Sequence, residues 1–142
     1  MDSARLLHLL LLGAWAGLLL AEGVVEGLAR GEEGGLRAAA RIHYWMDLLI
    51  EAPLLAGVIA TGIVLAVQAP VLTPTHWIKI GAGLVAVGAN AYCVVVVVRR
   101  YRQRDDLAAL KRHSRRILLA SPAVGLPFGA LAAYLGFAHF VM

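Results

Sequence analysis

The sequence predicts an all-α polytopic membrane protein, a single-domain up-down bundle of four transmembrane helices. Of its 142 residues, 61% are hydrophobic and only 15% are charged, and the mean hydropathy is +0.77. Soluble domains are about half apolar and a quarter charged, so this composition excludes an ordinary water-soluble globule. Four stretches reach or approach the roughly 20 residues that a helix needs to cross a bilayer. They are residues 5–28, 43–67, 75–98 and 117–141.

The first span, 5–28, is apolar until near its end, where Glu22 and Glu26 interrupt it. A basic residue followed by an apolar run can also begin a secretory signal peptide, but residues 19–21 form a poor cleavage context. Gly13 and Gly17 have the spacing through which membrane helices pack closely. We therefore interpret this segment as a retained helix.

The other three spans contain long uncharged runs. In the second span, 43–67, Pro53 removes a backbone donor and predicts a bend beside Glu51. The third and fourth spans, 75–98 and 117–141, complete the bundle. The aromatic residues are expected in two settings, with Trp15, Tyr92 and Tyr134 inside the bundle and Trp45, Tyr101 and Trp77 at the membrane interfaces.

The connections differ sharply in charge. Residues 29–42 and 99–116 hold eleven of the thirteen basic residues, and the short link 68–74 holds none. Because cytoplasmic loops are rich in Lys and Arg, both long connections are expected in the cytoplasm and both termini outside. An Asp-Asp pair before residues 107–116 predicts a short helix that returns the chain to the membrane. The net charge of +4 thus reflects topology, and it indicates the lipid bilayer as partner rather than nucleic acid.

Four of the nine acidic residues lie inside the predicted spans. A charge at membrane depth costs at least about 2.5 kcal/mol, which makes such residues functional candidates. Glu22 and Glu26 share one helix face, and His43, Asp47 and Glu51 form an i, i+4, i+8 ladder on the next helix. Because the two helices run in opposite directions, the acids match in depth, with the deeper pair about 12 Å from the cytoplasmic end at 1.5 Å per residue. Asn90 and Ser121 reach similar depth from the remaining spans.

Carboxylates that share a low-dielectric site cannot all stay ionised without a compensating cation or bound protons. A metal ion could be coordinated, as in soluble four-helix bundles with inward carboxylates and histidines. Protons could be held and relayed for transport or quinone chemistry. Alternatively, Arg30, Arg37 and Arg41 could neutralise the acids in a structural network. The metal ion is the leading hypothesis, with Glu22, His43, Asp47 and Glu51 as ligands and Glu26 and Asn90 in support.

A second set of polar residues lies toward the outer side. His8, His76 and His139 are all expected in the outer leaflet, and neutral imidazoles are common haem ligands. They define an alternative, a haem b or quinone-associated redox protein. Isolated histidines at a membrane interface also serve simply as polar anchors. His113, in the basic connection, is expected to be solvated.

Several short motifs occur along the four spans, namely Leu7-His8, Trp15-Ala16-Gly17, Thr61-Gly62, Trp77-Ile78-Lys79, Asn90 and Arg99-Arg100. Together they resemble the four-helix unit of the copper-resistance D membrane proteins and the related HemJ-type protoporphyrinogen oxidases. The resemblance covers most of the chain and implies a bacterial inner-membrane protein that handles copper, or a haem-associated porphyrinogen oxidase. His8 is the position it implies to be shared.

The acidic cluster departs from the pattern of that group. Copper(I) prefers thiolate and thioether ligands, and Met46 and Cys93 are too few to build such a site, so Fe, Mn or Zn fits the carboxylates better. No catalytic nucleophile, phosphate-binding glycine loop or nucleotide motif occurs, which disfavours hydrolases and ATP-driven proteins. The sequence therefore predicts a membrane protein for metal handling or metal-dependent redox work, with an accessory subunit of a membrane complex as a further alternative. Glycine faces would also permit a homodimer.

Overall fold

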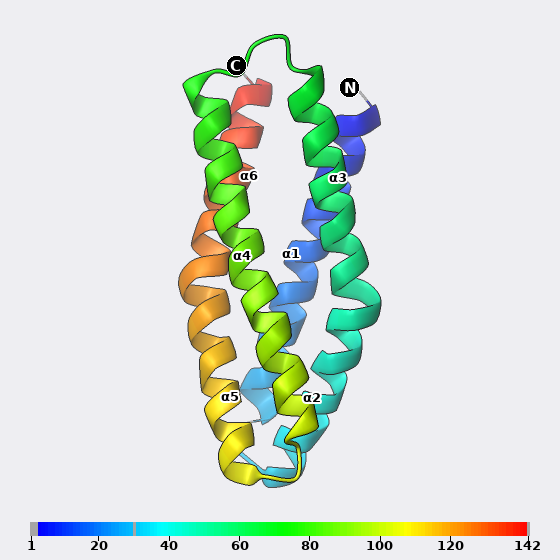
Figure 1. The fold of residues 1–142 in the computed structure, drawn as a ribbon, viewed down its shortest axis with the longest axis vertical. Helices are drawn as coiled ribbons and strands as arrows, with labels where there is room; N and C mark the ends of the chain where they lie inside the picture. The colour runs from blue at the N-terminus through cyan, green and yellow to red at the C-terminus, as the bar shows by residue number, and fades with distance from the viewer. Residues whose placement is uncertain (1–2, 30, 142) are drawn as a thin grey trace.

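The structure, a computed structural model, describes residues 3–29 and 31–141 and is helical almost throughout, with no strand in those ranges. Residues 33–68 and 107–141 each form one continuous rod, so the chain folds into four long helical rods (Figure 1). All four contain a helix long and apolar enough to cross a membrane, as the sequence predicts. The elements are α1 (Ser3–Ala29), α2 (Glu33–Met46), η1 (Asp47–Glu51), α3 (Ala52–Gln68), α4 (Pro74–Arg102), α5 (Leu107–Ala120), η2 (Ser121–Gly125) and α6 (Leu126–Val141).

The rods run alternately up and down (Figure 1). Both chain ends and the α3–α4 turn lie at one end of the bundle, and the α1–α2 and α4–α5 connections lie at the other, which we call the basic end. Helix α1 packs mainly on α3, and α4 packs mainly on α6. Helices α2 and α5 contact each other and α4 near the basic end. The bundle therefore consists of two helix pairs that α2, α4 and α5 tie together at the basic end.

The prediction of a long loop over residues 29–42 is wrong, because α2 already begins at Glu33. Leu36 and Ala40 lie one turn apart on α2, and both are buried against Leu110 of α5. This apolar stripe stabilises a helix here, because a helix places Leu36 and Ala40 on the same face, toward α5. The expected short helix after the Asp-Asp pair is present as α5.

The chain contains an internal repeat that its residue identities barely show. Three elements of the second half start 74 residues after their counterparts in the first: 33 and 107 for α2 and α5, 47 and 121 for η1 and η2, and 52 and 126 for α3 and α6. The buried Leu36 and Leu110 correspond under this shift, as do Pro53 and Pro127. The second and fourth rods thus share the positions of their helices, π-helical turns and prolines.

The two π-helical turns have a common cause. Pro53 and Pro127 each follow a π-helix by two residues, and neither has an N–H to bond to the carbonyl four residues earlier. In η1, the N–H of Ala52 instead bonds to the carbonyl of Asp47, five residues back. Such wide turns inside α-helices occur frequently at functional sites. The bend that the sequence predicts at Pro53 takes this form.

The interior differs from the sequence prediction in two respects. Trp15 is buried, but Tyr92 and Tyr134 are 49% and 68% exposed on the outside of the bundle. Gly13 and Gly17 face open space, so they do not pack within the chain. Close approaches of glycine occur instead on the other helices, where Gly57 faces Leu11. Small residues therefore permit the α1–α3 packing from the α3 side.

Replacing Asp106 with alanine is expected to cost about 1 kcal/mol of folding free energy. The Asp106 carboxylate accepts hydrogen bonds from the N–H groups of Ala108 and Ala109 at 2.9 and 3.1 Å and so caps α5. Thermal unfolding in detergent micelles measures the change. The neighbouring Asp105→Ala variant is the control and should unfold as wild type does; an equal loss in both would contradict the capping role.

Candidate metal centre

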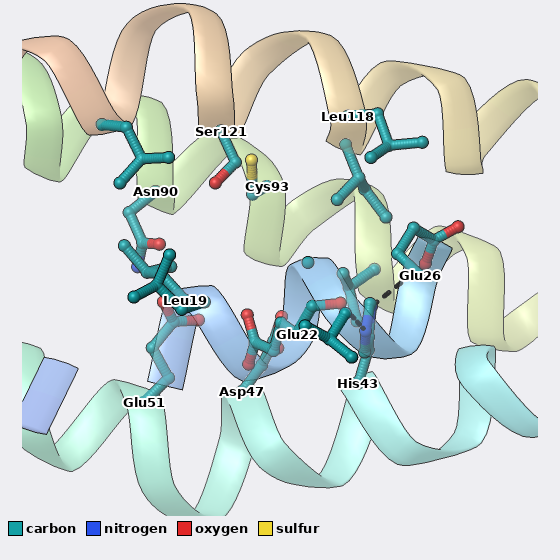
Figure 2. Close-up of a pocket in the computed structure, with 16 residues that line it drawn as sticks. Leu19, Glu22, Glu26, His43, Asp47, Glu51, Asn90, Cys93, Leu118 and Ser121 are labelled. Atoms are coloured by element: carbon teal, nitrogen blue, oxygen red, sulfur yellow. Dashed lines mark hydrogen bonds and ion pairs between the residues drawn. The ribbon is translucent and has the colours of Figure 1, made fainter. Parts of the chain in front are cut away.

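Three acidic side chains meet in the interior of the bundle. Glu22 projects from α1, and Asp47 and Glu51 project from the π-helix η1 (Figure 2). One carboxylate oxygen from each lies within 4.8 Å of the other two. Asp47 and Glu51 are buried, and Glu22 is partly buried. These are the acids that the two opposing helix faces were predicted to bring together.

The cluster borders a cavity of about 280 Å³. Its wall combines the acids with Asn90 and Cys93 from α4 and Ser121 from η2, and with leucines such as Leu19 and Leu118 (Figure 2). Asn90 is only 6% exposed and its side chain points toward Glu51, yet its Nδ2 atom has no hydrogen-bond partner among the described residues. Oε1 of Glu22 is likewise buried without a partner. A buried polar atom without a partner is costly, so the cavity has unmet bonding capacity.

Trp15 fixes the deepest acid. Its indole Nε1 donates a hydrogen bond of 3.1 Å to Oε1 of Glu51. The Trp15 ring also lies 4.0 Å from the position that a Cβ atom would take on Gly129, so the ring fills the space between α1 and α6. Trp15 therefore holds one Glu51 oxygen and leaves the other for a ligand.

Glu26 belongs to a separate network with Arg100. Nη1 of Arg100 donates to Oε2 of Glu26 at 2.6 Å, and the two side chains are 0% and 1% exposed. Ser114 of α5 donates to the other oxygen, Oε1. Arg100 also reaches the carbonyl of Leu36 at 3.4 Å. Both oxygens of Glu26 are thus engaged, which places it outside the acidic cluster.

Arg100, which neutralises the interior Glu26, is therefore not one of the arginines that the sequence analysis considered for this role. Arg37 forms an exposed ion pair with Glu33 at 2.6 Å, Arg41 forms no ion pair within the described ranges, and Arg30 lies outside them. The expected network of these arginines with the membrane acids is wrong for Arg37 and Arg41. Arg100 takes the role from the third helix.

His43 lies between the two networks. Its Nδ1 atom is 3.5 Å from Oε2 of Glu26, and its Nε2 atom is 3.2 Å from the carbonyl oxygen of Glu22 (Figure 2). Both ring nitrogens face these partners, so His43 orients the α1 backbone beside the cluster. Of the six candidate ligands, the structure groups Glu22, Asp47 and Glu51, sets Asn90 next to them, and gives Glu26 and His43 other partners.

Two of the three histidines proposed as haem ligands, His8 and His76, have hydrogen-bond partners within the protein. Nδ1 of His8 lies 2.8 Å from the hydroxyl of Thr61, which itself donates to the carbonyl of Gly57. His76 closes the capping box of α4 with Thr73. The His139 side chain lies outside the described residues. His113 is buried and hydrogen-bonded to Gln103, so its expected solvation is wrong.

The charges in the cavity do not balance. No Lys or Arg pairs with the three clustered acids among the described residues, and the buried Arg100 pairs with Glu26 instead. One carboxylate oxygen from each of the three acids lies within 4.8 Å of the other two, so the group requires a proton or a cation between them.

No family model, curated protein or solved structure matches this chain. The resemblance to the copper-resistance D and HemJ-type proteins therefore stays a prediction.

Proposed function

We propose that Glu22, Asp47 and Glu51 bind a divalent metal ion, Fe²⁺, Mn²⁺ or Zn²⁺, inside the membrane, for metal handling or metal-dependent redox work. The observation that carries the proposal is three carboxylate oxygens within 4.8 Å of one another without a basic partner. In a low-dielectric cavity such a group needs a compensating positive charge. A divalent ion would supply that charge and would also bind the buried Glu22 oxygen that has no hydrogen-bond partner.

The donor set favours these metals. Carboxylate oxygens suit Mn²⁺, Fe²⁺ and Zn²⁺, whereas copper(I) prefers sulfur. Asn90 can add its amide oxygen if the amide group turns over, and Cys93 and Ser121 border the same cavity. Water would complete the coordination, because the cavity holds more than the ion alone.

The proposed orientation follows from the positive-inside rule. The basic end lies in the cytoplasm of a bacterial cell, and both termini lie outside the inner membrane. The metal site then sits in the cytoplasmic half of the bilayer.

Metal content tests the proposal directly. Protein purified in detergent without chelator should carry close to one Fe, Mn or Zn per chain by plasma mass spectrometry, and Glu51→Gln should lose it while remaining folded. Glu33→Gln is the matched control, because Glu33 is an exposed acid paired with Arg37. Equal metal in wild type and Glu51→Gln, or none in wild type after loading with each of the three ions, would overturn the metal site.

A second candidate function, proton binding and relay, is favoured by the close approach of the Glu22 and Asp47 carboxyl groups, of which one oxygen each lies within 4.8 Å of the other. Two acids that lie so close can share one proton. The protein would then carry no metal, and infrared spectroscopy would show a protonated carboxyl band that disappears in Asp47→Asn.

A further inference from the structure

A second cavity lies at the basic end, outside the acidic cluster. It has a volume of about 470 Å³ and lies between α2 and the end of α4. Arg37, Arg41 and Trp45 line it from α2, and Tyr101, Arg104 and Asp105 line it from the other side. We call it the arginine groove. One acidic residue thus faces three arginines.

The aromatic side of the groove is rigidly built. The rings of Tyr44 and Tyr101 stack with centroids 4.2 Å apart and planes at 12°. Trp45 meets Tyr44 edge to face at 5.2 Å. The Arg104 guanidinium lies 4.7 Å from the centroid of the Tyr101 ring. Stacking and cation–π contact hold these side chains in place across the α2–α4 boundary.

The arginines keep donors free. Arg41 has no hydrogen bond or ion pair within the described ranges. Arg104 donates one hydrogen bond, from Nη1 to the carbonyl of Tyr101 at 3.2 Å. A guanidinium has five N–H donors in a planar fork that fits phosphate oxygens. The groove therefore offers unused donors beside an apolar aromatic wall.

We propose that the arginine groove binds a phosphate-bearing anion at the membrane surface, with Arg41 and Arg104 contacting the phosphate and Trp45 packing on the adjoining apolar part. The chemistry is shared by the headgroup of an anionic phospholipid and by a free organic phosphate. Basic pockets between helices at the cytoplasmic membrane surface bind anionic headgroups in this way. The proposal is independent of the metal site.

The other half of the chain provides an internal comparison. The 74-residue shift that relates the halves takes Arg37 to Lys111 and Arg41 to Arg115, so the charge is repeated. The same shift replaces Trp45 by Leu119 and relates Tyr101 to Gly27. General attraction to an anionic membrane should therefore involve Arg41 and Arg115 alike, whereas a built site should involve only Arg41, which lies beside Trp45 and Tyr101.

Binding is measured by native mass spectrometry of detergent-solubilised protein titrated with dioctanoyl phosphatidylglycerol, and with dioctanoyl phosphatidylcholine as the zwitterionic comparison. One phosphatidylglycerol should bind more tightly than any phosphatidylcholine. Arg41→Gln should weaken it about fivefold, the equivalent of about 1 kcal/mol per basic residue. Arg115→Gln, the matched control, should leave it unchanged. Glycerol phosphate, added as competitor, distinguishes the two sources: displacement at equal concentration identifies a free phosphate compound, and no displacement identifies a lipid.

Two results would overturn the proposal. Equal weakening by Arg41→Gln and Arg115→Gln would reduce the effect to general charge attraction. Equal affinity for phosphatidylglycerol and phosphatidylcholine would show that the groove does not recognise an anion. Both arginines are exposed, so the variants should fold as wild type does, which thermal unfolding checks.

Discussion

Arg100→Gln is expected to cost about 3–5 kcal/mol of folding free energy, because it leaves the Glu26 carboxylate buried without its partner. Nη1 of Arg100 lies 2.6 Å from Oε2 of Glu26, and both side chains are fully buried, so water cannot replace the guanidinium. Thermal or denaturant unfolding in detergent measures the loss. Arg99→Gln is the matched control: Arg99 is the exposed neighbour on the same turn of α4, and its variant should unfold as wild type does.

The double variant separates the charge pair from mere packing. Glu26→Gln combined with Arg100→Gln removes both charges, so it should lose less stability than Arg100→Gln alone. Additive losses in the double variant would contradict a coupled ion pair.

Metal loading is expected to raise the stability of the wild-type protein by about 2.7 kcal/mol when the free ion is at a hundred times its dissociation constant. The ion would bind the folded site and not the unfolded chain, where the three carboxylates are far apart. Unfolding of the chelator-treated protein is followed during titration with Mn²⁺, Fe²⁺ or Zn²⁺. In Asp47→Asn the increase should vanish, since one of three charged ligands is gone.

The metal-free proteins make a complementary comparison. Without an ion, the clustered acids of the wild type must be protonated, or their mutual repulsion lowers the free energy of unfolding. Asp47→Asn should therefore be at least as stable as wild type. A large loss in the metal-free Asp47→Asn variant would mean that Asp47 acts as a structural hydrogen-bonding group. Stabilisation by metal that is equal in both proteins would place the ion elsewhere.

The clustered acids are confined to the first half of the chain. Glu22, Asp47 and Glu51 correspond to Val96, Ser121 and Gly125 under the 74-residue shift, so only the first half carries the clustered acids. The second half supplies Asn90, Cys93 and Ser121 to the opposite wall of the cavity. Glu26 and Arg100 are also 74 residues apart, and they form an ion pair between α1 and α4.

Helical spacing predicted part of the site. The i, i+4, i+8 ladder places His43, Asp47 and Glu51 on one face, and all three are buried in the structure. Depth matching along antiparallel helices set Glu22 level with Glu51 and Glu26 level with Asp47, whereas the structure groups Glu22 with both Asp47 and Glu51 and pairs Glu26 with Arg100. Spacing could not show that His43 turns to the Glu22 carbonyl, because the choice depends on side-chain rotation. The repeat was also hidden, since the halves share the positions of their turns and few of their side chains.

The sequence by itself determined the helical, four-rod architecture, because long apolar runs and charged connections act locally along the chain. It also determined which acids face inward, since helix periodicity is a local property. Only the tertiary structure decided which partner each acid receives. Arg100 and Glu26 are far apart in sequence, and Arg99 and Arg100 are chemically alike, so the rotation of α4 alone selects the arginine that enters the core. That rotation is set by packing over the whole bundle, and it leaves Glu22, Asp47 and Glu51 without a basic partner within residues 3–29 and 31–141.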